Sequence, residues 1–206
     1  MLVTQDFYPI KMINFKKFWF FVALIVLDLF MTGAALTIDY RDFIETPFYL
    51  WIFVPICSLY PLLLVVNYIW FLWQKKWSQW LLNFTAVGII SYALMALVFY
   101  SLYMYNRGFT WYEFGNIFWV LLYGSQIFVI WKYLKKIHWV GYASILAYFL
   151  AKDFLDRFSV TYSYQRYGIL SSFELNVFFV AVLVLHILAF CFIVRVMYKR
   201  KVDELS

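Results

Sequence analysis

The sequence predicts an all-α integral membrane protein with six transmembrane helices, a short interfacial helix after the first, and both termini in the cytoplasm. Of its 206 residues, 66% are hydrophobic and only 14% are charged, whereas soluble domains are about 45–50% apolar. The apolar residues also form continuous runs of roughly 20, the length with which a helix crosses a bilayer core. This composition excludes a soluble enzyme, a disordered chain and a nucleic-acid-binding domain.

Six apolar runs have the length of a membrane-spanning helix, and they are too long and too continuous for the alternating strands of a β-barrel. The first run follows three lysines as a signal peptide would, but Asp28 interrupts it, so we expect a retained helix. Residues 1–206 are treated as one polytopic membrane domain. The expected spans cover about 18–37, 57–73, 80–105, 114–133, 139–155 and 175–196.

The orientation follows from the basic residues. Six spans place both termini on one side, and that side carries 12 of the 17 lysines and arginines, against five on the other. Because basic loops stay in the cytoplasm, both termini are expected there, in a multi-pass protein of the cell membrane. Tryptophans and tyrosines gather at the span ends, where such rings favour the headgroup region of the lipid bilayer.

Two prolines shape the segment between the first and second spans. Thr46-Pro47 is typical of a helix start, and Pro55 interrupts the helix that would follow it. A short helix in the membrane interface, turning into the second span between Pro55 and Pro61, accounts for this pattern. One long, kinked second span is the alternative.

The same segment resembles a known family. Thr46-Pro47 followed by Leu50-Trp51-Ile52-Phe53-Val54-Pro55, together with Lys152-Asp153-Phe154-Leu155-Asp156, is similar to an uncharacterised family of bacterial and archaeal membrane proteins, catalogued as domain of unknown function fourteen-oh-five. The order of elements agrees over nearly the whole chain. The resemblance implies a multi-span fold and no reaction. Some relatives in Gram-positive bacteria are encoded beside cytochrome bc subunits, which implies a respiratory context.

The chain also departs from that family at three places. Ile56 stands where the family has an acidic residue, and Ser91-Tyr92-Ala93 stands where it has lysine-tyrosine-glycine. The fourth span lacks the family's histidine. The resemblance therefore implies no activity that depends on these positions.

Two ionisable residues fall near the middle of expected spans, Asp28 in the first and His186 in the sixth. Ionisable groups at this depth are costly and mark candidate functional sites. If the two helices touch, Asp28 and His186 would form an intramembrane polar pair, serving either as a proton relay or as a hydrogen bond between helices.

A second group of charges is expected at the external ends of the helices. Asp153 and Asp156 share one face at the end of the fifth span, and the spacings Lys152–Asp156 and Asp153–Arg157 suit ion pairs. Asp39, Arg41 and Asp42 in the first external loop complete the candidate cluster. It would either close the outer ends of the helices or bind a cation or substrate.

Other sites are not expected. Asn67, Ser91, Ser125, Gln126 and Ser144 are interpreted as contacts between closely packed helices. The two histidines, His138 and His186, lie at different depths, which argues against a haem, and no metal site, cofactor or Cys57–Cys191 disulfide is expected.

The leading functional hypothesis is a non-catalytic accessory or structural subunit of a larger membrane complex with other membrane protein subunits as partners, in a respiratory context. The alternative is a proton- or cation-linked carrier, or a membrane-embedded enzyme, that uses Asp28, Asp153, Asp156 and His186.

Overall fold

The computed structural model describes residues 15–51, 53–54, 56–157 and 171–203, and every element in these ranges is helical. This confirms the all-α prediction. The elements are α1 (Phe15–Glu45), the 3₁₀ turn η1 (Phe48–Leu50), α2 (Ile56–Gln74), α3 (Gln79–Arg107), α4 (Trp111–Gly124), α5 (Ile127–Trp131), α6 (Trp139–Arg157) and α7 (Ser172–Asp203). Ser125 and Gln126 interrupt what is otherwise one helix, α4–α5.

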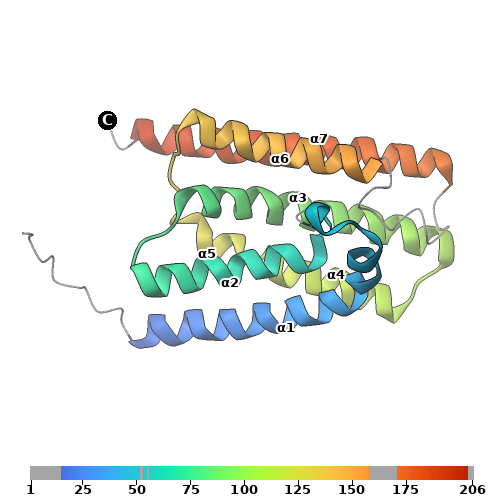
Figure 1. The fold of residues 1–206 in the computed structure, drawn as a ribbon, viewed down its shortest axis with the longest axis horizontal. Coiled ribbons are helices and arrows are strands. Elements are labelled where there is room, and N and C mark those ends of the chain that lie inside the picture. Colours follow the sequence, from blue (N-terminus) through green and yellow to red (C-terminus); the bar gives the residue numbers. More distant parts are fainter. Residues whose placement is uncertain (1–14, 52, 55, 158–170, 204–206) are drawn as a thin grey trace, which may run out of the picture.

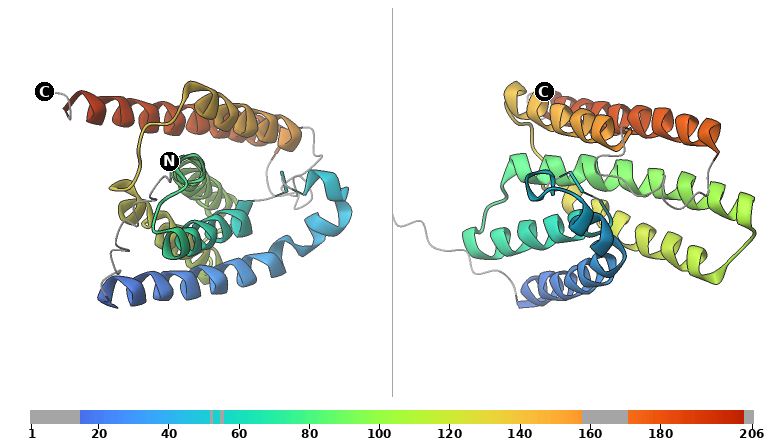
Figure 2. Two further views of the ribbon diagram at one scale, coloured as in Figure 1. Left: turned by 60° about the vertical axis from the view of Figure 1, so that its left-hand side comes forward. Right: turned by 45° about the vertical axis from the view of Figure 1, so that its right-hand side comes forward.

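The helices lie side by side and alternate in direction, so that α1 begins at the same end of the bundle at which α7 finishes (Figure 1). α3 occupies the centre, because it contacts α2, α4, α5 and α7. In the most apolar 18-residue stretch of α3, 67% of the residues are buried. The corresponding share is 22–33% in the other three long apolar helices. The views in Figure 2 show α6 and α7 paired on one side of α3, with α1, α2 and α4 on the other.

Four helices are long and apolar enough to cross a membrane: Phe15–Thr37, Gln79–Arg107, Trp111–Trp131 and Phe173–Lys199. They correspond to the first, third, fourth and sixth expected spans and indicate a multi-pass membrane protein. The helices at the other two expected spans, α2 and α6, are shorter or more highly charged. The apolar part of α2 is the shorter stretch Ser58–Gln74, and α6 carries four charged residues among its last six positions.

The connection after α1 differs from the expected loop. α1 continues through residues 38–45, which we expected outside the membrane helix, and ends where the Trp51 indole donates to the carbonyl oxygens of Phe43 (2.9 Å) and Thr46 (3.0 Å). These bonds satisfy carbonyls that the helix end leaves without a partner. The expected interfacial helix is reduced to the single turn η1, capped by Pro47. Pro61 lies inside α2.

Polar side chains at mid-depth join helices as expected in three cases. Asn67 Nδ2 donates to Thr85 Oγ1 (2.9 Å) between α2 and α3, and Trp80 Nε1 donates to Ser144 Oγ (2.9 Å) between α3 and α6. Gln126 is the third case, described below. Ser91 and Ser125 instead bond to carbonyl oxygens of their own helices, a common use of serine in membrane helices.

Candidate functional site

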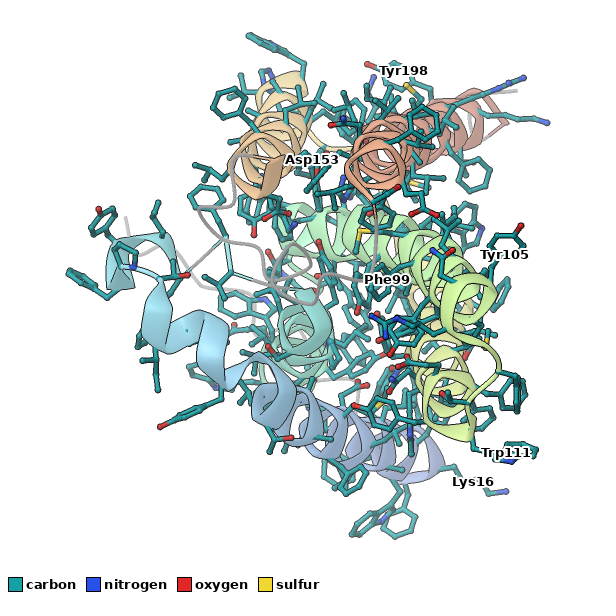
Figure 3. All side chains as sticks on the ribbon, turned by 90° about the vertical axis from the view of Figure 1, so that its right-hand side faces the viewer. Lys16, Phe99, Tyr105, Trp111, Asp153 and Tyr198 are labelled. Carbon is teal, nitrogen blue, oxygen red and sulfur yellow. The ribbon has the colours of Figure 1, made fainter. Side chains whose placement is uncertain are left out.

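Four ionisable side chains are buried together between α6 and α7. Lys152, Asp153, Asp156 and His186 are between 1% and 7% exposed, and we call them the α6–α7 cluster. Figure 3 views the bundle end-on and shows Asp153 between these two helices. Charged side chains are rarely buried this fully without partners, and each of these four has one.

The cluster consists of two neighbouring pairs. Lys152 Nζ forms an ion pair with Asp156 Oδ2 one turn further along α6, as the four-residue spacing predicted. Asp153 Oδ2 lies 2.8 Å from His186 Nδ1 on α7. The imidazole ring also stacks on Phe149, with ring centroids 4.8 Å apart, which fixes its orientation towards the carboxylate.

The cluster lies midway along the bundle and not at its external end. His186 is the central residue of the apolar stretch Phe173–Lys199. α6 begins beside the last turns of α7, where Lys136 Nζ lies 3.6 Å from the centroid of the Tyr198 ring. Because α6 has 19 residues and α7 has 32, the acidic end of α6 stops beside the middle of α7. Asp153 and Asp156 therefore lie beside the middle of α7, whereas we expected them at the external ends of the helices.

Tyr60, on α2, lies beside the α6–α7 cluster. Its side chain is fully buried and close enough to interact electrostatically with Asp153 and Asp156. The ring packs against the backbone of α3 at Gly88, where an added Cβ would come within 2.1 Å of a ring carbon. Two polar atoms here, the Tyr60 hydroxyl and Asp153 Oδ1, are buried without a hydrogen-bond partner among the described residues. Buried polar atoms left in this state mark places where water or an ion binds.

A second buried network joins α1, α2 and α4–α5. The Gln126 side chain, at the interruption between α4 and α5, donates to Asp28 Oδ1 (2.5 Å) and accepts from the Tyr68 hydroxyl (2.8 Å). Thr32 Oγ1 donates to the backbone oxygen of Asp28 (2.7 Å). Asp28 is completely buried, and its Oδ2 has no hydrogen-bond partner among the described residues.

The structure therefore corrects the pairing of Asp28 with His186. Each residue has another partner, Gln126 for Asp28 and Asp153 for His186. The physical reason is the arrangement of the helices: α1 packs on α2, whereas α7 packs on α3 and α6. The side chains of Asp39, Arg41, Asp42 and Arg157 lie outside the described residues, so their place in a charged cluster stays a prediction.

Sequence reasoning named most of these residues but missed Tyr60, Tyr68 and Gly88. A signal existed for Gly88, because a glycine in a long apolar helix indicates a close approach. Nothing in the sequence indicates that its neighbour is Tyr60.

No protein-family profile matches the chain, and neither a curated protein nor a solved structure matches it.

Proposed function

We propose that this multi-pass membrane protein is an ion-linked carrier in which the Asp153–His186 pair accepts and releases protons. The observation that supports it most is the 2.8 Å contact between these two buried side chains, of which His186 is the central residue of an apolar span. Ionisable groups at this depth are costly, and histidine is the side chain whose charge changes most readily near neutral pH.

The chemistry requires only movements of protons within the cluster. In the protonated imidazole, Nδ1–H donates to Asp153 Oδ2. Loss of the proton on Nε2 leaves a neutral ring whose Nδ1–H still donates to the same oxygen. The neighbouring Lys152–Asp156 ion pair carries one positive and one negative charge, which compensate each other. The unpartnered Asp153 Oδ1 and Tyr60 hydroxyl are the places at which a water would connect the pair to a proton path.

Vesicles containing the purified protein and an internal pH-sensitive dye test the proposal. An imposed membrane potential should drive proton entry in the wild type, and Asp153→Asn and His186→Gln should reduce it to the level of protein-free vesicles. His138→Gln is the matched control, because His138 is the other histidine and is exposed. The proposal fails if the wild type carries no protons or if both variants carry them normally.

A second candidate function is an accessory subunit of a larger membrane complex. In the most apolar stretches of α1 and α4–α5, only 28% and 22% of the residues are buried within the chain. Wide faces of these two spans are therefore available for contact with lipid or with another subunit. Mild detergent extraction followed by size analysis distinguishes the two, since an accessory subunit migrates with larger partners and a self-contained carrier migrates alone.

The proposed topology has six spans with both termini in the cytoplasm. Lysines cluster where α1 begins, between α2 and α3, and between α5 and α6, and these sites share the end of the bundle at which α7 finishes (Figure 1). Cysteines introduced at Lys76 and Lys199 should react with an impermeant reagent only from the cytoplasmic side. Reaction of the two from opposite sides would contradict an even number of spans.

A further inference from the structure

A cavity of about 240 Å³ lies between α1, α2, α3 and α4, and no residue of the α6–α7 cluster lines it. Six aromatic side chains from α1, α3 and α4 dominate its lining: Phe30, Tyr92, Tyr100, Tyr112, Trp119 and Tyr123. Because three of these helices are long apolar spans, a molecule that reaches the cavity is one that dissolves in or enters from the membrane.

Two buried carboxyl groups adjoin residues that line this cavity, although neither group is itself part of the lining. Asn116 lines it, and its Nδ2 donates to Oε2 of Glu113 (3.3 Å), a side chain that is only 7% exposed. On α1, Asp28 precedes the lining residue Met31 by nearly one turn of the helix. Its Oδ2 is one of the buried oxygens without a hydrogen-bond partner among the described residues.

Neither carboxyl group has a counter-charge among the described residues. Within the part of the chain that the structure describes, Asp28 and Glu113 form no ion pair. A buried carboxyl group is charged only where a cation or several donors compensate it, and is otherwise neutral. The faces of aromatic rings carry negative potential and attract cations, most strongly when they are desolvated. The rings and both carboxyls thus favour the same sign of charge.

We propose that this cavity binds a membrane-soluble organic cation, a quaternary ammonium group attached to an apolar or aromatic body. The size agrees, because a cavity of roughly 150 Å³ accommodates benzene and the cavity here is larger by about the volume of a small substituent. A neutral acyl chain would fill the apolar space but would use neither the negative faces of the rings nor the two carboxyl groups. The inference does not depend on the proposed proton site, which lies on other helices.

Equilibrium dialysis of the full-length protein in nanodiscs of phosphatidylglycerol, a lipid without a quaternary ammonium group, tests the proposal. The probe is benzyltrimethylammonium, and neopentylbenzene, which has the same shape without the charge, is the control ligand. Saturable binding of the cation above the level of empty nanodiscs is expected, without saturable binding of the neutral compound. Repeating the dialysis in phosphatidylcholine nanodiscs identifies the source, because a lipid headgroup that occupies the site would compete with the probe.

Variants locate the site. Glu113→Gln and Trp119→Leu should each weaken binding of the cation about tenfold, the effect of losing one charge or one cation–π contact in a desolvated place. Glu174→Gln and Trp111→Leu are the matched controls, since Glu174 bonds to Asn106 and Ser171 and Trp111 is highly exposed. These controls should bind the cation like the wild type.

Three results would overturn the proposal: no saturable binding of the cation, equal binding of the neutral compound, or unchanged affinity in both Glu113→Gln and Trp119→Leu. Asp28→Asn provides a further measurement if it folds, and the other two variants decide the matter if it does not.

Discussion

Replacing Gly88 by alanine should destabilise the protein through one contact. The added Cβ would lie 2.1, 2.6 and 2.9 Å from three carbon atoms of the Tyr60 ring, and essentially no real carbon contacts are so short. The Tyr60 side chain is completely buried, so neither the ring nor the helices can move apart without disturbing other contacts. Overpacking of this kind costs roughly 1–3 kcal/mol.

The intrinsic effect of the substitution has the opposite sign. Alanine is favoured over glycine within a helix by about 1 kcal/mol, so we expect a net loss of roughly 0–2 kcal/mol relative to the wild type, and of roughly 1–3 kcal/mol relative to a glycine-to-alanine change without the clash. Gly115→Ala on α4 and Gly33→Ala on α1 isolate this intrinsic effect, because no atom lies within 4 Å of the Cβ at either position. Both controls should be as stable as the wild type or more stable.

The free energy of unfolding in mixed detergent micelles measures the difference, with helix content followed by circular dichroism. A second variant that combines Gly88→Ala with Tyr60→Leu should recover part of the loss that Gly88→Ala causes, since the smaller side chain leaves space for the new methyl group. If Gly88→Ala is as stable as Gly115→Ala, the close packing of Tyr60 on α3 is refuted, and with it the position of Tyr60 beside the α6–α7 cluster.

Three other outcomes follow from buried contacts and can be measured in the same unfolding assay. Gln126→Leu should lower the free energy of unfolding by about 2–4 kcal/mol, because it removes a donor to Asp28 and leaves buried polar atoms without partners. A loss no larger than that caused by substituting an exposed serine would contradict the network. Asp156→Asn should lower the free energy of unfolding by roughly 3–5 kcal/mol, because it leaves Lys152 without the carboxylate that it binds. The double variant Lys152→Met with Asp156→Leu should recover most of that loss. Equal losses in the single and double variants would show that the unpaired lysine is not the cause. Trp77→Phe should be nearly neutral, since the ring stacks on its neighbours while its buried Nε1 has no hydrogen-bond partner among the described residues, and a large loss would reveal one.

Local features of the sequence were sufficient for the fold class. Continuous apolar runs can only be helices in a membrane, because the backbone must satisfy its own hydrogen bonds there. The Lys152–Asp156 ion pair was equally predictable, since a four-residue spacing on a helix fixes which side chains are neighbours. The contacts of Asn67 and Ser144 with other helices followed from their depth alone.

The tertiary structure decided which helices are neighbours and where each helix stops. Asp28 and His186 have similar depths in the sequence, yet one packs beside Gln126 and the other beside Asp153, and no local pattern records such a choice. The residues 38–45 continued α1 because the Trp51 indole, held by η1, satisfies its last carbonyls. Likewise, a helix of 19 residues beside one of 32 placed the acidic end of α6 in the middle of the bundle. Hydropathy describes each segment separately, whereas the relative lengths and offsets of packed helices determine which of their polar side chains meet.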